Sequence, residues 1–460
     1  MSHAQIHLGA FLMGNGHHLA AWRHPKAQAG RLDFAHFQRL ARTAERGLFD
    51  VVFFADNLAL LGSPELASQT AQAEVFDPLL LLAALAPVTE RIGLVATLST
   101  SYNDPYLLAR RFATLDHLSG GRAGWNLVTS ATDQEALNFS RAQLPEHAQR
   151  YRQAEEFIDV ARGLWDSFAD DAFIRDRATG RYFDPAGLHT LEHRGEHYQV
   201  RGPLNQPRPP QGHPLLVQAG SSEPGKELAA RTADVVFTAQ QRLEDAQQFY
   251  VDLKGRLARH GRAADALKIM PGISPVLGRT QSEAEDLYAE LQNLIEPSLG
   301  LALLSGMAGG LDLSAFPLDG PLPELPPSNT MKSRQALFVE MARRENLTLR
   351  QLYLRAAGAR GHCTLVGDPR QIADHLEEWF HAGAADGFNI MPPLLPDGLE
   401  RFVDWVVPEL QRRGLFRRAY QGTTLREHLG LAMPPRAGYP VREGHATAAS
   451  STTPPRVTAP

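Results

Sequence analysis

Residues 215–240 have the sequence LLVQAGSSEPGKELAARTADVVFTAQ, in which a helix-like run lies between two strand-like runs. LLVQAG is a short apolar run that predicts a buried strand, KELAARTA predicts a helix, and VVFTAQ predicts the next strand. A strand, a helix and a strand in this order form the repeating unit of a parallel sheet with helices packed on it. The stretch therefore predicts an α/β fold.

The turn inside this unit bears on phosphate binding. Residues Gly220 to Lys226 match the G-x-x-x-x-G-K part of a nucleotide-binding P-loop, but Glu227 stands where that loop needs Ser or Thr. This departure disfavours an NTPase. The backbone N–H groups of Ser221 and Ser222, at a helix start, suit a phosphate monoester held without metal. The alternative is a plain Ser cap with Pro224 in the first helical turn.

Eight strand-like runs alternate with helical patterns along the chain. They are IHLGAFL from Ile6, DVVFFAD from Asp50, IGLVATLS from Ile92, AGWNLVTS from Ala123, LLVQAG from Leu215, VVFTAQ from Val235, LKIMPGIS from Leu267 and GFNIMP from Gly387. Eight runs favour a closed (β/α)8 TIM barrel. Asp33 and Asp104 are the predicted N-caps of two helices, which end near Gly47 and Gly120.

One barrel domain over residues 1–433 accounts for this pattern, with two insertions. Residues 170–214 separate the fourth and fifth strands, and residues 296–362 hold a helix-capable stretch after a Pro-rich segment. Insertions in a barrel commonly form lids over the carboxyl ends of the strands or contacts between subunits, and 296–362 is the candidate lid. The polar tail 434–460 cannot bury enough apolar surface and is predicted to be disordered.

Composition and charge exclude several classes of protein. A net charge of −5 and a pI near 6.4 argue against nucleic acid or an anionic membrane as the main partner. Cys363 is the single cysteine, so no intrachain disulfide and no cysteine-based zinc site can form, and no metal site is expected. The N-terminus has no signal-peptide pattern and the apolar run 79–88 is too short to span a membrane, which predicts a cytoplasmic protein.

Polar residues recur where the predicted strands end. In a barrel the chemistry lies at this edge, so hydroxyls, an amide and a carboxylate there form a surface suited to a polar heterocycle. Each could instead be a helix cap. The residues are Asp56 after the second strand, Thr97, Ser99 and Thr100 on the third, Asn126, Thr129 and Ser130 on the fourth, and Ser221 and Ser222 after the fifth.

Two further pairs are candidates for the same site. His147 and Tyr151 lie four residues apart, so a helix places both on one face, where they can donate to a phosphate. The alternative is a solvated first turn. His17 and His18 follow the first strand and are candidate general acids or bases at the barrel mouth, or else loop residues.

Long motifs in this order resemble the flavin-dependent, bacterial luciferase-like monooxygenases. The resemblance is strongest to the group of nitrilotriacetate monooxygenase component A, whose other members act on EDTA, dibenzothiophene sulfone, dimethyl sulfide and long-chain alkanes. It extends from about residue 5 to about residue 433. The motifs are TAERGLFDVVFFAD at 43–56, YNDPYLLARRFATLDHLSGGRAGWNLVTS at 102–130, RGPLNQPRPPQGHPLLVQAGSSEPGKELAARTADVVFTAQQ at 201–241, ARRENLTLRQLY at 342–353 and GAADGFNIMPPLLP at 383–396.

The resemblance implies a luciferase-like (β/α)8 barrel that binds FMN at its mouth. Reduced FMN would come from a separate NAD(P)H-dependent flavin reductase and react with O2, and the resulting flavin peroxide would transfer one oxygen atom to the substrate. Asp56, Thr97, His147, Tyr151 and Ser222 match the FMN contacts of the family, with the last three on the phosphate side. Ser221 and Asn126 are added from the strand-end pattern, and His17 is the candidate proton donor or substrate ligand.

The substrate and the assembly stay open at this stage. A sulfur compound, an amine or a hydrocarbon are the alternatives, and apolar residues expected at the mouth (Phe11, Met13, Trp22 and Phe54) mildly favour a sulfur compound or a hydrocarbon. A homodimer or homotetramer is expected from the resemblance. A flavin-binding barrel without oxygenase activity is the alternative function.

Overall fold

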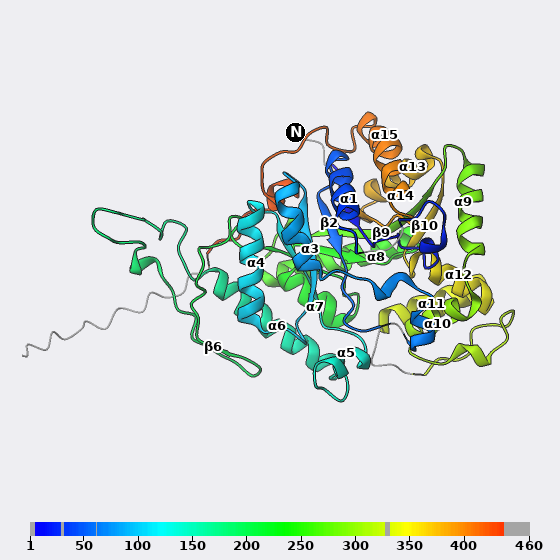
Figure 1. The fold of residues 1–460 in the computed structure, drawn as a ribbon, viewed down its shortest axis with the longest axis horizontal. Coiled ribbons are helices and arrows are strands. Elements are labelled where there is room, and N and C mark those ends of the chain that lie inside the picture. Colours follow the sequence, from blue (N-terminus) through cyan, green and yellow to red (C-terminus); the bar gives the residue numbers. More distant parts are fainter. Residues whose placement is uncertain (1–4, 29–31, 61, 327–331, 437–460) are drawn as a thin grey trace, which may run out of the picture.

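The computed structural model describes residues 5–28, 32–60, 62–326 and 332–436. Within them, eight parallel strands close into a barrel with helices around it (Figure 1). The ring closes because β9 pairs with both β8 and β11, and β11 pairs with β1. The barrel strands are β1 His7–Phe11, β2 Val51–Phe54, β3 Gly93–Ser99, β4 Ala123–Val128, β7 Leu215–Gln218, β8 Val235–Thr238, β9 Lys268–Leu277 and β11 Gly387–Ile390. All eight predicted strands are barrel strands, and the predicted fold is confirmed.

Helices cover the outside of the barrel and begin where the caps predict. Asp33 accepts a hydrogen bond from Ala35 N at 3.0 Å and Asp104 from Leu107 N at 2.9 Å, while Gly120 ends its helix at φ 68°. The helices are α1 Phe34–Arg46, α2 Pro64–Ala67, α3 Pro78–Leu85, α4 Pro105–Ser119, α5 Asp133–Asn138, α6 His147–Trp165, α7 Glu223–Thr232, α8 Leu243–Leu257, α9 Gln281–Asn293, α10 Pro297–Met307, α11 Lys332–Glu345, α12 Leu349–Ala359, α13 Pro369–His381, α14 Asp397–Arg401, α15 Val407–Arg412 and α16 Leu425–His428.

Strand alternation divides the apolar core into two layers. Phe53 joins the cluster inside the barrel, whereas its neighbour Phe54 joins the cluster between the strands and the helices. The short helix α16 closes the amino-terminal end of the barrel, because Leu425 and Leu429 belong to the inner cluster. Gly93 makes room for this plug: a Cβ there would lie 2.6 Å from Leu425 Cδ1. The lower half of the barrel is therefore solid core.

Three short strands were not expected. β10 Cys363–Gly367 pairs in parallel with Ile273–Leu277 of β9, so it extends the sheet without entering the ring. Its three central residues are only half-buried, so its sequence lacks the strong apolar signal of the barrel strands. β5 His193–Arg194 and β6 Gln199–Val200 form a small antiparallel hairpin.

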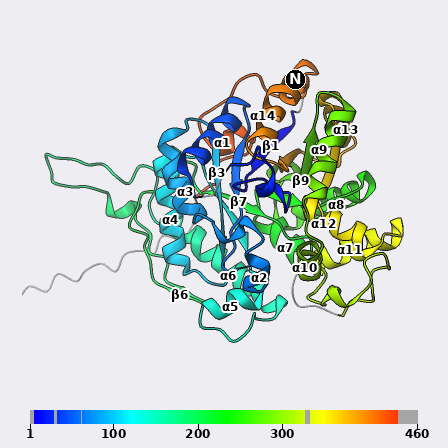
Figure 2. The same cartoon turned by 45° about the vertical axis from the view of Figure 1, so that its right-hand side comes forward.

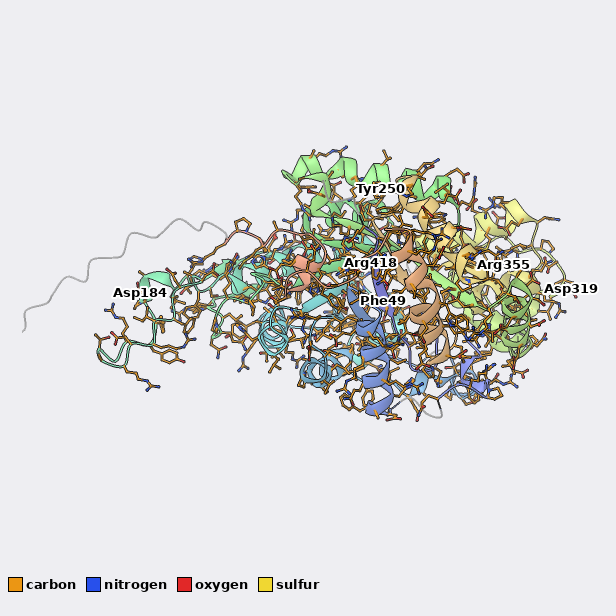
Figure 3. The ribbon with its side chains drawn as sticks, turned by 90° about the horizontal axis from the view of Figure 1, so that it is seen from above. Phe49, Asp184, Tyr250, Asp319, Arg355 and Arg418 are labelled. Carbon is orange, nitrogen blue, oxygen red and sulfur yellow. The ribbon has the colours of Figure 1, made fainter. Side chains whose placement is uncertain are left out.

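The two insertions differ in shape. Most of 170–214 forms an arm that extends away from the barrel, with Asp184 near its far end (Figures 1 and 3). The second insertion carries α10, α11 and α12, which lie together at one side of the barrel in two views and share their own hydrophobic cluster (Figures 1 and 2). Of the predicted tail 434–460, residues 437–460 lie outside the described residues.

No helix in the described ranges has the length and apolar character that crossing a membrane requires.

A buried ion pair links the amino-terminal end of the barrel to the carboxyl-terminal segment. Asp50, with no solvent exposure, accepts hydrogen bonds from Leu8 N at 2.7 Å, from His7 Nδ1 at 3.2 Å and from Arg417 Nη2. Burial alone would raise the pKa of Asp50, but the charges of Arg417 and His7 and these hydrogen bonds outweigh it and hold the pKa at about 2. Asp50 therefore joins β1, β2 and the segment that leads to the α16 plug.

We expect Asp50→Ala to lower the free energy of unfolding by about 3 to 5 kcal/mol, because it leaves the buried Arg417 guanidinium without its carboxylate. The matched control is Asp404→Ala, which breaks the solvent-exposed pair with Arg46 and should cost less than about 1 kcal/mol. Urea unfolding of both variants measures the two values. Equal losses would contradict the role assigned to Asp50.

Candidate functional site

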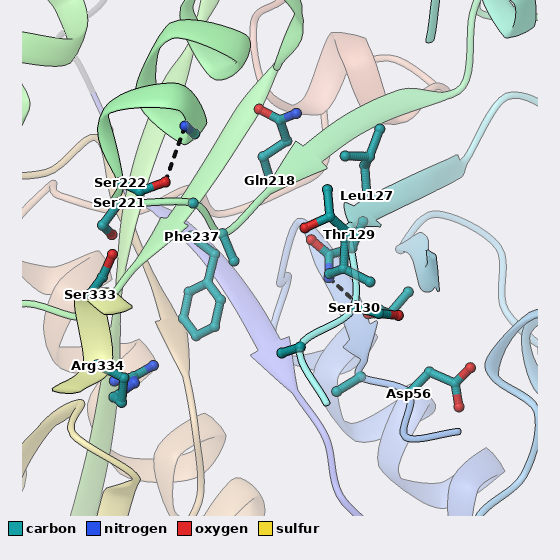
Figure 4. A pocket seen from close by; sticks show the side chains of 18 of the residues that line it. Asp56, Leu127, Thr129, Ser130, Gln218, Ser221, Ser222, Phe237, Ser333 and Arg334 are labelled. Carbon is teal, nitrogen blue, oxygen red and sulfur yellow. Dashed lines mark hydrogen bonds between the residues drawn. The ribbon is translucent and has the colours of Figure 1, made fainter. Parts of the chain in front are cut away.

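A cavity of about 550 Å³ opens at the carboxyl ends of the barrel strands (Figure 4). Its wall comes from the segments that follow β2, β4, β7 and β8, from the first turns of α6, α7 and α11, and from the residue before β10. This volume lies in the range of about 300 to 1,000 Å³ typical of small-molecule and cofactor sites. Such a position is where barrel enzymes carry their chemistry.

Aromatic rings form the deep apolar part of the cavity. Phe11 meets Phe53 edge-on, with ring centroids 4.6 Å apart, and meets Phe237 in the same way at 5.5 Å. His362 stacks on Phe237, with centroids 4.8 Å apart and planes 9° apart. Burial first, and then the nearby Arg334, keep the pKa of His362 well below its usual value, so the imidazole is neutral. These rings provide an apolar surface for an aromatic ligand.

Buried amide groups face this apolar surface. Thr97 donates to Phe54 O at 2.8 Å, and Asn126 Nδ2 donates to Thr97 Oγ1 at 2.8 Å. Asn126 Oδ1 and Gln218 Oε1 are both buried at the wall and have no hydrogen-bond partner among the described residues. An unpaired buried carbonyl oxygen costs about 1 to 3 kcal/mol, which a bound N–H donor would relieve. The wall therefore suits a heterocycle with ring N–H groups.

The turn before α7 forms a cradle of small residues. Ser222 caps the helix, because its Oγ accepts from Gly225 N at 3.3 Å. A Cβ on Gly220 would lie 3.1 Å from Gly225 Cα and 3.1 Å from the Tyr151 hydroxyl, so a larger residue would fill the space. The Ser222 cap is therefore present, and the predicted phosphate site would occupy the same turn.

Lys226, the P-loop lysine of the NTPase alternative, is directed to α8. Its Nζ pairs with Asp252 Oδ2 at 2.6 Å and with Glu223, and the residue is not among the described residues that line the cavity. A P-loop needs this lysine at the phosphates. The geometry therefore argues against nucleotide hydrolysis.

Cationic groups surround the cradle. His147 and Tyr151 lie on one face of α6, with ring centroids 4.7 Å apart, and both line the cavity. Arg150 is buried beside them and donates to Ser130 O. Burial, and then the charges of Arg150 and Lys332, lower the pKa of His147. Arg150 and Lys332 also line the cavity, and their positive charges favour an anion at this end.

Asp56 lies on the other side of the cavity from Ser222 (Figure 4). Burial is the main cause that raises the pKa of Asp56 to about 6, and the charge of Asp77 adds to it. A carboxyl group with a pKa near neutrality, placed in a cavity, is typical of a functional site.

The structure brings seven of the eight predicted site residues to one cavity wall. They are Asp56, Thr97, Asn126, His147, Tyr151, Ser221 and Ser222. His17 is buried behind Phe11, with its ring against that phenyl group at 4.4 Å and its Nε2 2.9 Å from Phe11 O. It is not among the described lining residues, and its role as a proton donor stays a prediction.

Only some of the other polar residues predicted at the strand ends line the cavity. Thr129 and Ser130 line the cavity, whereas Ser99 and Thr100 do not: Ser99 bonds to Ser130 Oγ at 2.8 Å and Thr100 to Val128 O at 3.3 Å. Of the four apolar residues expected at the mouth, Phe11 alone lines this cavity in the described chain. Phe54 faces the helix layer, and Met13 and Trp22 line a separate small pocket, so the predicted apolar mouth is wrong for these three.

Sequence reasoning missed several wall residues, among them Gln218, Arg334 and His362. Gln218 ends β7, and the strand-end rule that selected its neighbours would have found it. Arg334 and His362 belong to the second insertion and its end, and His362 stacks on Phe237, which is 125 residues earlier in the chain. No sequence pattern marks them.

Comparisons with known proteins agree with this geometry. The family model described as luciferase-like monooxygenase matches residues 15–386. N-acetyl-S-(2-succino)cysteine monooxygenase from Bacillus subtilis (strain 168) is 54% identical and the match covers 94% of this chain and 97% of that protein. Nitrilotriacetate monooxygenase component A from Aminobacter aminovorans is 52% identical over 94% and 97%. The crystal structure of DmoA from Hyphomicrobium sulfonivorans superposes with a TM-score of 0.85 at 34% identity, covering 92% of each chain.

We expect Asp56→Asn to stabilise the flavin-free protein at pH 8 by about 2 kcal/mol and to leave its stability unchanged at pH 4. The pKa of Asp56 is raised from 3.8 to about 6 in the folded state, so its stabilising protonated form is lost as the pH rises between these values. Asn remains neutral throughout. Thermal melts across this range measure the difference.

Asp77→Asn is the matched control. Asn still caps α3, but removal of the Asp77 charge should weaken the pH dependence that Asp56 causes. A difference between Asp56→Asn and the wild type that is the same at pH 4 and pH 8 would refute the assignment.

Proposed function

We propose, because this chain belongs to the luciferase-like monooxygenase family, that it is the oxygenase component of a two-component, FMN-dependent monooxygenase. It would receive reduced FMN from a separate NAD(P)H:flavin reductase and insert one atom of O2 into a small organic substrate. One observation supports the proposal most strongly. The same cavity contains the turn of small residues before α7, the buried amide oxygens of Asn126 and Gln218 without hydrogen-bond partners, and a group of aromatic rings.

The phosphate of FMN fits the start of α7. Backbone N–H groups of Ser221 and Ser222 and the partial positive charge of the helix favour an anion there. The Tyr151 hydroxyl lies over Gly220 and Gly225, and His147 is the neighbouring donor on α6. No metal ion is needed for such binding.

The isoalloxazine ring fits the deeper half of the cavity. Asn126 Oδ1 and Gln218 Oε1 supply acceptors for ring N–H groups, and Asp56 lies at the same rim. The Phe11, Phe53 and Phe237 cluster supplies an apolar surface that excludes water. When bound in reduced form, FMN would supply the activation of O2.

The helices of the second insertion are the candidate cover of this site. Lys332, Ser333, Arg334 and Leu337 of α11 all line the cavity. We infer that this segment acts as the lid that limits access of water to the bound flavin. Residues 327–331, which precede α11, lie outside the described residues.

The activity itself can be tested with the purified chain, a flavin reductase, NADH, FMN and O2. The panel of substrates should contain N-acetyl-S-(2-succino)cysteine, nitrilotriacetate, dibenzothiophene sulfone, dimethyl sulfide and a long-chain alkane, the compounds that similar proteins are named for. We expect one oxygenated product that requires all five components and takes its new oxygen from 18O2. Tight FMN binding with only hydrogen peroxide formed would favour a flavin-binding protein without oxygenase activity.

Ser222→Asp tests the phosphate assignment separately. Asp is as good an N-cap as Ser, so α7 should remain intact, but its charge would oppose the phosphate. We expect FMN binding to weaken about 100-fold or more, and riboflavin binding, which involves no phosphate, to change far less. Fluorescence titration measures both ligands.

Thr280→Asp is the control for this variant, because Thr280 caps α9 in the same way but does not line the cavity. It should leave FMN affinity unchanged. Unaltered FMN affinity in Ser222→Asp would show that the cradle holds no phosphate.

A further inference from the structure

Arg334 is a cationic side chain in the cavity wall that lacks a counter-charge. It lies in the first turn of α11, and its Nη1 atom is shielded from solvent without a hydrogen-bond partner. Its Nη2 atom is 3.4 Å from His362 Nε2. No carboxylate of the described chain lies within 4.0 Å of its guanidinium nitrogens, and the undescribed residues 327–331, PSNTM, contain none.

Two buried arginines of this protein pair with carboxylates. Arg208 pairs with Asp166 at 2.9 Å, and Arg426 pairs with Asp234 at 2.8 Å. A guanidinium removed from water without an anion costs several kcal/mol, because no protein charge replaces its hydration. The cost is larger here because Arg360 lies close enough to oppose the charge of Arg334. An anion from outside the chain would relieve it.

The neighbours of Arg334 hold the guanidinium in place. A Cβ on Gly361 would lie 2.8 Å from Arg334 Nη1, so the arginine packs directly on this glycine. Gln241 Nε2 donates to Gly361 O at 2.8 Å and to His362 O at 2.9 Å, which fixes the segment below it. His362 is held in turn by its stacking on Phe237. A charged donor fixed at a wall before ligand arrives is suited to recognition.

Arg334 lies on the same side of the cavity as the phosphate cradle, beyond Ser333 (Figure 4). Besides burial, the charge of Lys332, two residues earlier, lowers the pKa of His147 at the cradle. Besides burial, the charge of Arg360 lowers the pKa of Arg334, and the side chain of His362 contacts Arg334. In Figure 4 Arg334 lies below Ser333 and across the cavity from Asp56. The first turn of α11 thus presents two cationic side chains to the cavity, and Arg334 is the one next to His362.

We propose that Arg334 binds a carboxylate of the substrate, so that the enzyme oxidises small anionic organic compounds rather than neutral sulfides or hydrocarbons. This inference rests on the proposed function, because it assigns the substrate to the same cavity as FMN. A guanidinium and a carboxylate can form two parallel hydrogen bonds, which fixes orientation as well as affinity. The aromatic rings next to Arg334 would then hold the oxidisable part of the substrate against the flavin.

The test uses the complex of the full chain with FMN, titrated with succinate, nitrilotriacetate and the neutral analogue succinamide. Changes in the flavin absorbance spectrum report binding. We expect the wild type to bind at least one carboxylate, and Arg334→Gln to bind that compound about 10- to 150-fold more weakly, the loss of a charged hydrogen bond. Succinamide should show no dependence on Arg334, and Arg334→Lys should be intermediate.

Arg343→Gln is the matched control, since Arg343 is exposed on the same helix and does not line the cavity. Carboxylate binding by neither protein, or equal binding by wild type and Arg334→Gln, would overturn the proposal. A loss of FMN affinity with riboflavin affinity retained would instead assign Arg334 to the phosphate. If the wild type did not bind FMN at all, the proposed function itself would be wrong. The FMN titration tests the proposed function, and the carboxylate titration tests the role of Arg334, so the two failures can be told apart.

Discussion

Closure of the parallel barrel is the constraint on which the site depends. Because β9 pairs with β8 along its first half and with β11 further on, every barrel strand points the same way around one ring. All the carboxyl ends of the strands therefore meet at one rim. Asp56, Asn126 and Ser222, which are distant in the chain, become neighbours of one cavity for this reason alone.

The two ends of the barrel carry different buried groups. At the amino-terminal end, Asp50 and Arg417 form an ion pair, and the α16 plug fills the interior with leucine side chains. At the carboxyl-terminal end, Asn126 Oδ1 and Arg334 Nη1 are buried in the cavity wall without hydrogen-bond partners. Buried polar groups are normally paired, so a ligand in the cavity can satisfy these two atoms.

The second insertion adds to the barrel what its strands cannot supply. The strand ends contribute hydroxyls, amides and one carboxylate, whereas two of the cations that line the cavity, Lys332 and Arg334, come from α11. This helix belongs to a hydrophobic cluster of its own with α10 and α12, so its cations can vary without disturbing the barrel core. Under the proposed function, the strand ends would hold the flavin and α11 would face the substrate within one fold.

The sequence by itself determined the barrel and most of its polar rim. Apolar runs such as LLVQAG and polar strand ends such as Thr97 and Asn126 are local features. A strand that is buried on both sides needs a short run of apolar residues, and the polar residues at its end are adjacent to that run, so both can be recognised in a short stretch of sequence. Only the tertiary structure decided which side chains meet. It turned Phe54 and Lys226 away from the cavity, left His17 behind Phe11, and brought Arg334 and His362 to the wall. These outcomes depend on helix packing and on contacts between distant segments, and no local pattern encodes such contacts.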